Sequence, residues 1–346
     1  MVPLADPQVD RETIEHVSSL LASGDLSTGE AVEEFEQTFG AFSDRKYATA
    51  VCSGSVALEM ALEAVFDSGS RIALSPYNCG ATLYSVLRAG LQPAFVDAEP
   101  DSCGIDPESL STVGTSVDGV LVAHLFGEPS RVDDLLTVSD ANDITVVEDF
   151  AQAPGAEADG RVTGSIGTVS VCSFGATKNI TTAEGGVVLS DDPAIEERVS
   201  RSRSNTDDVS PPPRSVRMND IEATIGLGQL ENYDETVGRK RHIAEIYRQV
   251  SDIGRHPATR QGATNVYHAY PIRHADADRL ADHLEAHDIG TSRLYSKPLH
   301  EYDEAPSVDR SFPVAEALSA EIVLLPIHAG MSEADAKEVV ATLESF

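Results

Sequence analysis

The chain has 346 residues, enough for two domains with a sizeable core, and 57 acidic residues against 25 basic ones give a net charge of −32. A charge of this sign repels phosphates and excludes a nucleic-acid partner. The sequence has no apolar run of about 18 residues and no basic leader before an apolar segment, so we expect no membrane span, no signal peptide and a cytoplasmic location. The four cysteines lack CxxC spacing, so we expect no metal site and no disulfide framework.

The acidic surplus also predicts a protein that works in concentrated salt. Only five of the 25 basic residues are lysine. Self-repulsion destabilises a compact chain unless ions screen it, and the screening length falls to about 3 Å at 1 M salt. We therefore interpret the composition as halophilic. The alternative is an ordinary acidic protein.

Hydrophobic periodicity predicts alternating helices and strands along the first two thirds of the chain. Helical spacing occurs in residues 6–21, 30–42, 56–66, 81–89, 193–203 and 217–233. Short apolar strand patterns occur in residues 48–51, 71–75, 92–96, 120–124, 144–147, 169–172 and 187–189. This alternation is typical of an α/β fold whose mostly parallel sheet carries helices on both faces, and we expect the last strand to reverse direction.

The remainder of the sequence predicts a second, smaller unit. A polar loop at 204–217 contains three consecutive prolines, which cannot be helical. Helical patterns follow at 239–250, 277–287 and 332–346, with strand patterns near 266–272 and at 322–325. We place the domain boundary near residue 235, so that residues 1–235 form a large domain and residues 236–346 a smaller C-terminal α/β domain.

Three chemically useful side chains follow two of the predicted strands. Asp149 comes after the strand at 144–147, Ser173 comes after the strand at 169–172, and Lys178 lies five residues further on. Reactive groups in an α/β sheet gather beyond the carboxyl ends of its strands. A lysine that forms an imine, an acid that protonates a pyridine nitrogen and a hydroxyl that binds phosphate together suit pyridoxal phosphate (PLP). Each of these residues also has a simpler explanation when it is taken alone: the lysine could be a solvated surface residue, and an acid or hydroxyl after a strand could belong to a turn or cap a helix.

A turn of small residues provides a candidate phosphate site. Gly54 and Ser55 lie between the strand at 48–51 and the helical pattern at 56–66. Free backbone N–H groups at a helix start attract anions, although a plain N-cap serine is the simpler explanation. His124 ends another strand and fits either a site residue or a satisfied buried histidine.

The stretch from Val146 to Leu189 resembles the DegT/DnrJ/EryC1/StrS aminotransferases, which are PLP-dependent enzymes of fold type I. The matching residues are Glu148-Asp149, Ala151-Gln152, Gly155-Ala156, Gly164-Ser165, Ser173-Phe174, Lys178 and Glu184-Gly185-Gly186. Weaker matches extend the resemblance nearly from end to end, at Gly54-Ser55-Val56-Ala57-Leu58, His124-Leu125-Phe126-Gly127 and Leu325-Pro326-Ile327-His328. The implied fold is that of aspartate aminotransferase.

The resemblance implies a role for each site residue. Lys178 would carry the cofactor, Asp149 would face the pyridine nitrogen, and Gln152 would contact the ring or its phenolic oxygen. The phosphate would be held by Gly54, Ser55 and Ser173. Among the other lysines, Lys297 is the rival for a role at the site. We expect solvated positions for Lys46, Lys240 and Lys337.

Two departures from the family pattern concern the surroundings of the cofactor. The family's ring-stacking aromatic residue falls here at Cys79 or Gly80, and Tyr77 is the nearby candidate to replace it. The family's asparagine that reaches the neighbouring subunit's phosphate is replaced by Ser215, after a shortened loop. The sugar pocket is therefore less defined than the chemistry.

The sequence predicts a PLP-dependent aminotransferase that forms a homodimer with shared active sites. The resemblance implies glutamate as the amino donor, a keto group on a nucleotide-linked sugar as the acceptor, and a place in polysaccharide biosynthesis. One alternative is a PLP-dependent sugar dehydratase, although that branch has histidine where Lys178 stands. The other is a binding or regulatory protein that has kept the fold without the activity.

Overall fold

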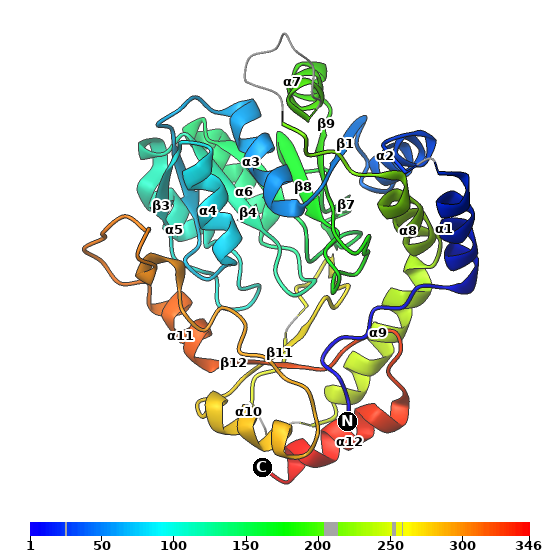
Figure 1. The fold of residues 1–346 in the computed structure, drawn as a ribbon. Coiled ribbons are helices and arrows are strands. Elements are labelled where there is room, and N and C mark those ends of the chain that lie inside the picture. The colour runs from blue at the N-terminus through cyan, green and yellow to red at the C-terminus, as the bar shows by residue number, and fades with distance from the viewer. Residues whose placement is uncertain (25, 204–213, 251–253, 258) are drawn as a thin grey trace.

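The computed structural model describes residues 1–24, 26–203, 214–250, 254–257 and 259–346. Its centre is a seven-stranded sheet in the order β1-β9-β8-β5-β4-β2-β3 (Figure 1). The strands are β1 (Tyr47–Val51), β2 (Arg71–Leu74), β3 (Gln92–Phe95), β4 (Gly119–Ala123), β5 (Thr145–Asp149), β8 (Val169–Ser173) and β9 (Gly186–Ser190). All neighbours pair in parallel except β9, which is antiparallel to β8 and to β1. The predicted mostly parallel sheet with a reversed last strand is confirmed.

Helices cover both faces of this sheet. They are α1 (Arg11–Ser23), α2 (Glu30–Phe42), α3 (Gly54–Val65), α4 (Gly80–Arg88), α5 (Pro107–Val113), α6 (Val132–Asn142), α7 (Pro193–Arg203) and α8 (Asp220–Glu231). One face packs on α3, α4 and α7 through side chains such as Leu74, Leu121 and Val171. The other packs on α5 and α6 at one end, and on α2 and α8 at the other. Burial of both faces explains why these strands are almost wholly apolar.

The C-terminal part of the chain packs around a second core, below the sheet in Figure 1. Its elements are α9 (Tyr233–Tyr247), β11 (Tyr270–Arg273), α10 (Ala277–Ala286), β12 (Ile322–Leu325) and α12 (Glu333–Glu344). Helix α11 (Pro313–Glu321) packs instead against the first core, through Ala315 and Leu318. Strands β11 and β12 pair antiparallel. The boundary that we place at residue 235 falls in the first turn of α9, and the two-domain division stays a prediction.

The N-terminal segment differs from its prediction. Helix α1 begins at Arg11 rather than near residue 6, because the Asp10 side chain caps it by accepting from Thr13 N at 2.9 Å. Residues before it are extended, and Val2 pairs with Ile289 in the C-terminal part. The first residues of the chain therefore lie against its last third.

A second correction concerns the helix expected from residue 217. Helix α8 begins three residues later, after Asn219, whose side chain forms a capping box with Glu222. Arg217 instead pairs with Val51 at the end of the edge strand β1. Most of the proline-containing loop predicted before it lies outside the described residues.

Several elements have no counterpart in the sequence prediction. They are α5, α6, α11, the single-turn helices η1 (Gly114–Ser116) and η2 (Leu299–Glu301), and the two-residue strands β6 (Glu157–Ala158), β7 (Arg161–Val162) and β10 (Ala263–Thr264). In the described ranges, no helix is both long enough and apolar enough to cross a membrane.

Candidate active site

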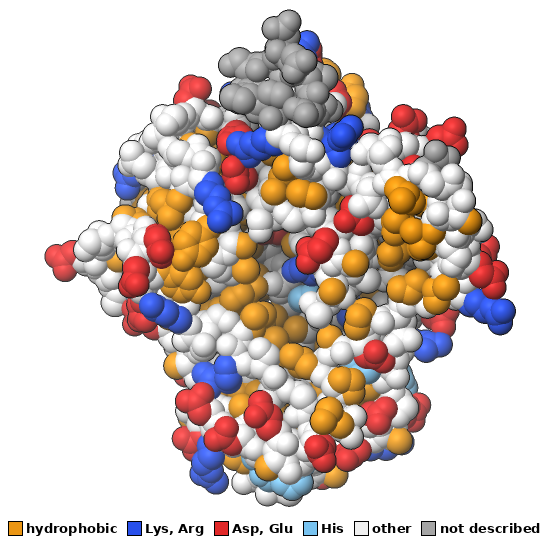
Figure 2. All heavy atoms as spheres, in the orientation of Figure 1, with side chains coloured by type: hydrophobic (Ala, Val, Ile, Leu, Met, Phe, Trp, Pro, Cys, Tyr) orange, Lys and Arg blue, Asp and Glu red, His pale blue; other side chains and the backbone are white. Residues whose placement is uncertain are grey.

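Two cavities meet at Lys178, on the carboxyl side of the parallel strands. The first, of about 220 Å³, is lined mainly by the sheet and its loops, and we call it the sheet cavity. The second, of about 350 Å³, lies between the sheet, the C-terminal part and residues 4–8, and we call it the basic cavity. The side chains that line both are Cys79, Gln152, Lys178 and Tyr295. Figure 2 shows a hollow at the centre of this face with Lys or Arg and His atoms inside it.

The start of α3 forms one wall of the sheet cavity. Ser53 caps the helix by accepting from Val56 N at 3.3 Å, and the first-turn N–H groups have no partner within the helix. A Cβ atom on Gly54 would lie 2.4 Å from the Cβ of Ser173. Only glycine therefore allows the helix start to come this close to the end of β8.

Asp149 lies in the sheet cavity as the last residue of β5. One of its carboxylate oxygens accepts from Ala151 N at 3.0 Å. Burial raises the pKa of this carboxyl, whereas the Ala151 N–H and the positive charge of Lys178 oppose the shift. The acid and the amine therefore act on each other across the cavity.

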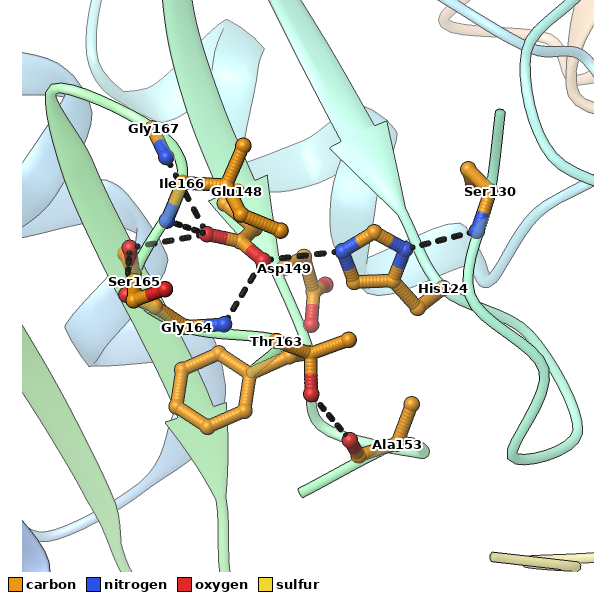
Figure 3. Close-up of polar contacts among 12 residues, drawn as sticks. His124, Ser130, Glu148, Asp149, Ala153, Thr163, Gly164, Ser165, Ile166 and Gly167 are labelled. Carbon is orange, nitrogen blue, oxygen red and sulfur yellow. Dashed lines mark hydrogen bonds and ion pairs between the residues drawn. The ribbon is translucent and has the colours of Figure 1, made fainter. Parts of the chain in front are cut away.

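Glu148, the residue before Asp149, is fully buried and is held by many donors (Figure 3). It accepts from the backbone N–H groups of Gly164, Ile166 and Gly167 at 2.6 to 3.1 Å, and it lies 2.9 Å from His124 Nε2. Burial alone would raise the pKa of Glu148, but the hydrogen bond from His124 and those from the N–H groups of Gly164 and Ile166 lower it. The anchored carboxylate fixes the direction of the next residue, Asp149.

The same contacts settle the tautomer of His124. Its Nδ1 accepts from Ser130 N at 2.9 Å, so the ring proton is on Nε2 and is donated to Glu148. His124 is therefore both a satisfied buried histidine and part of the wall of the sheet cavity. The sequence leaves open whether His124 is a site residue or a buried histidine with satisfied hydrogen bonds, and in the structure it is both.

Gln152 is fixed between two loops. Its Oε1 accepts from Phe126 N at 2.8 Å, and its Nε2 donates to the Tyr295 hydroxyl at 2.7 Å. Tyr295, which has a φ of 61°, reaches the cavity from the C-terminal part of the chain. Nothing in the sequence marks Tyr295 as a site residue, because it follows no predicted strand.

Two of the predicted site residues lie elsewhere. Tyr77 is fully buried, and its ring packs edge-on against Tyr295 with 5.5 Å between centroids. It is not among the residues that line either cavity, so its position does not support ring stacking on a cofactor. Ser215 is exposed beside the end of β1, where Cys52 N donates to Val216 O.

The other lysines differ in whether they reach the two cavities. Lys297 is exposed, with its ammonium 5.4 Å from the centroid of the Tyr302 ring, and it lines neither cavity. The solvated position predicted for Lys240 is wrong. Only 6% of Lys240 is exposed, because α9 directs it into the basic cavity. Sequence periodicity missed it because α9 has charged residues on both sides of this position.

The chain is similar to proteins of one family along nearly its whole length. GDP-perosamine synthase of Vibrio cholerae is 27% identical over 369 residues, covering 100% of this chain and 99% of that protein. The crystal structure of the sugar aminotransferase CalS13 from Micromonospora echinospora superposes with a TM-score of 0.92 at 27% identity, covering 100% of both chains.

A further similar protein was crystallised with a sugar product. DesI, described in the presence of its TDP-sugar product, has a TM-score of 0.91 at 25% identity, covering 100% of this chain and 92% of that one. The enzyme class predicted from the sequence, a PLP-dependent aminotransferase of fold type I, is confirmed by these similarities. The model of the DegT/DnrJ/EryC1/StrS aminotransferase family matches residues 7–344, and the chain belongs to that family.

Proposed function

We propose that the enzyme moves an amino group from an amino acid, glutamate in the first instance, to a keto group of a nucleotide-linked sugar. The observation that supports this most directly is the place of Lys178 at the junction of two cavities. The sheet cavity offers groups for a cofactor, and the basic cavity offers room for a substrate. An amine between them can reach atoms on either side.

The residues of the sheet cavity fit PLP. The start of α3 at Gly54 and Ser55, with the Ser173 hydroxyl beside it, presents donors to a phosphate. Asp149 offers a carboxylate to a protonated pyridine nitrogen, and the oriented Gln152 offers an amide near the ring. PLP, once bound, supplies an electron sink that stabilises negative charge at the substrate's Cα.

The protein's own groups would then handle protons and position. The Lys178 amine would hold the cofactor and, once the incoming donor has replaced it, would take the proton from the donor's Cα and return it two atoms away, beyond the nitrogen. Asp149 stays ionised opposite a positive ring nitrogen, because an adjacent positive charge lowers a carboxyl pKa. The buried Glu148 and His124 keep Asp149 in place.

The acceptor is proposed from the relatives. DesI is described with a TDP-sugar product, and two further relatives are named GDP-perosamine synthases. Another relative, from Bacillus subtilis, is named a spore coat polysaccharide biosynthesis protein. These names support a nucleotide-linked sugar acceptor and a place in polysaccharide biosynthesis.

We also propose a homodimer with shared sites. The segment Ser215 to Arg217 is held at the outer edge of the sheet, beside β1, and Ser215 and Arg217 are exposed there. A hydroxyl in this position is free to reach a second subunit's phosphate, and symmetric dimers are the commonest oligomers. Sedimentation that finds a fully active monomer would refute the shared site.

We also propose a cytoplasmic protein that is adapted to high salt, and the salt adaptation rests on the charge of −32. Full activity and an unchanged melting temperature in about 0.05 M salt would contradict the salt requirement, because the Debye length at that ionic strength exceeds 10 Å.

Absorbance spectra of the holoenzyme with and without glutamate test the first half of the proposal. The band of bound PLP is expected to convert to that of the amine form, and a panel of nucleotide keto-sugars is expected to restore it. Turnover of small keto acids alone would refute the sugar acceptor. Release of water from the sugar without amino transfer would favour the dehydratase alternative, and no spectral response to any amino acid would favour a regulatory protein.

A further inference from the structure

Four basic side chains line the basic cavity, together with the acidic Asp6. The four are Lys178, Lys240, His268 and His328. Burial lowers the pKa of His268 well below its usual value, and the charges of Lys178 and Lys240 lower it further. Burial also lowers the pKa of His328, Lys240 adds to this, and Asp6 opposes it. His268 therefore lies within electrostatic reach of both lysines, and His328 within reach of Lys240.

The two histidines of this cluster have ring nitrogens without a hydrogen-bond partner among the described residues. Only 7% of His328 is exposed, and neither of its ring nitrogens has a partner among the described residues. The Nδ1 atom of His268 likewise has none there. Buried polar atoms are nearly always paired, so such a group in a cavity marks a place where a ligand supplies the partner.

Lys240 is the strongest donor in the cluster. Its ammonium donates to Asn179 Oδ1 at 2.7 Å, and Asn179 Nδ2 in turn donates to Val266 O at 3.0 Å. An ammonium has three protons, which leaves two for a ligand. No carboxylate forms an ion pair with Lys240 within the part of the chain that the structure describes, although the chain has 57 acidic residues.

We propose that the cluster of Lys240, His268 and His328 is an oxyanion subsite that binds a carboxylate of the amino donor. A buried ammonium without a counter-charge is costly, and an incoming anion removes that cost. Asn179, which positions Lys240, directly follows Lys178. The subsite therefore lies within one small molecule's length of the reacting amine, and a phosphate on a nucleotide carrier would be the other chemical source of an oxyanion.

The basic cavity favours the carboxylate. It is closed on one side by residues 4–8, where Gln229 Nε2 donates to Gln8 O at 2.8 Å. Its volume of about 350 Å³ accommodates a dicarboxylic amino acid. This inference rests on the proposed function, because it assigns one of the two substrates to a part of the same site.

Calorimetric titration of the holoenzyme separates the two sources of oxyanion. Glutarate is the first probe, since it carries both carboxylates of glutamate but no amine and cannot react. Thymidine diphosphate is the second probe. In Lys240→Met the dissociation constant for glutarate is expected to rise about 10- to 100-fold, because a charge-assisted hydrogen bond is lost, whereas that for thymidine diphosphate is expected to stay constant.

Two further variants control the titration. Lys337→Met removes the same charge from an exposed side chain on α12 that pairs with Glu333, and it should change neither constant. His328→Asn removes a ring nitrogen from the subsite and should raise the dissociation constant for glutarate about 5- to 10-fold, which is less than the effect of Lys240→Met.

Each other result overturns the assignment. It fails if wild-type enzyme does not bind glutarate, if Lys240→Met binds it as tightly as wild type, or if only thymidine diphosphate is weakened. Failure of the proposed function has a different signature, since glutarate binding would stay intact while no amino group passes from glutamate to any nucleotide keto-sugar.

Discussion

The two cavities that meet at Lys178 have walls of opposite character. Behind the sheet cavity, next to its wall residue Asp149, the buried acid Glu148 is held by three backbone N–H groups and His124. In the basic cavity the buried Lys240 has one hydrogen bond, and both nitrogens of His328 have no partner among the described residues. The network behind the sheet cavity has its hydrogen bonds without a ligand, whereas the basic cavity keeps polar atoms that have no partner among the described residues.

This difference separates positioning from binding. A fully paired buried group is rigid and strongly stabilising, because its partners would be left unpaired without it. An unpaired buried charge lowers stability and keeps its interaction energy for a ligand. Replacing each kind of group should therefore change stability in opposite directions.

The largest expected effect comes from the residue that both cavities share. Lys178→Ala removes the amine that moves the proton, so the rate of amino transfer should fall about 10⁴-fold. The donors at Gly54 and Ser55 remain, and the cofactor should still bind by its phosphate. Turnover assays and the spectrum of bound cofactor check both points, with Lys337→Ala as the control. Retention of more than a tenth of the activity would place the proton transfer elsewhere.

Breaking the hydrogen-bond network of Glu148 should destabilise the fold. In Glu148→Gln the amide NH₂ faces backbone donors that a carboxylate satisfied, at a cost of about 3 kcal/mol. The folded-state pKa of Glu148 is lowered, so its stabilisation is present above the unfolded value of 4.5 and is lost as pH falls through the folded value. The loss of stability between pH 7 and pH 4, measured by chemical unfolding, should be larger in wild type than in the variant.

The exposed Glu338→Gln serves as the control for charge, since it should leave the free energy of unfolding within about 0.5 kcal/mol of wild type. An unchanged unfolding free energy in Glu148→Gln would show that the network is dispensable, and the contrast between the cavities would disappear.

A smaller effect is expected where the helix start touches the sheet. Gly54→Ala places a Cβ 2.4 Å from Ser173 Cβ, which should displace the N–H groups at the start of α3. The dissociation constant for PLP should therefore rise about 10- to 100-fold. Gly238→Ala on α9 is the matched control, because its added Cβ meets nothing within 4 Å. Equilibrium dialysis measures both, and equal retention of cofactor in the two variants would contradict the role of Gly54.

The smallest effect has the opposite sign. Burial lowers the pKa of Lys240 to about 8, so below that pH the folded state carries a poorly solvated charge. Lys240→Met should raise the free energy of unfolding at pH 7 by about 1 to 2 kcal/mol. The advantage should shrink between pH 8 and the unfolded value of 10.5, because there the folded wild type loses its proton first. A destabilised variant at pH 7 would mean that Lys240 is structurally satisfied.

Regular patterns made the sheet predictable. Each of its strands is a short apolar run because both faces are buried, and the parallel strands are followed by polar residues because their carboxyl ends face the site. Helices α5 and α6 were missed because they are short and carry mixed acidic and polar residues, and tertiary packing on Val120 and Val122 decides them.

Some residues of the site could be predicted from the sequence and others could not. Asp149, Ser173, Lys178, Gly54 and Ser55 stand at strand or helix ends, so the sequence could place them together. Lys240, His268 and Tyr295 come from the C-terminal part of the chain, and only the packing of that part against the sheet brings them to Lys178. Tyr77 was misplaced because sequence distance could not show that its ring turns into the core.

The central claim is that Lys178 joins the two cavities and carries the cofactor. Borohydride reduction of the holoenzyme, followed by proteolysis and mass spectrometry, reports which lysine holds it. We expect the reduced pyridoxyl group on Lys178 alone. Its appearance on Lys240 or Lys297, or on no lysine, would contradict this assignment and the mechanism that depends on it.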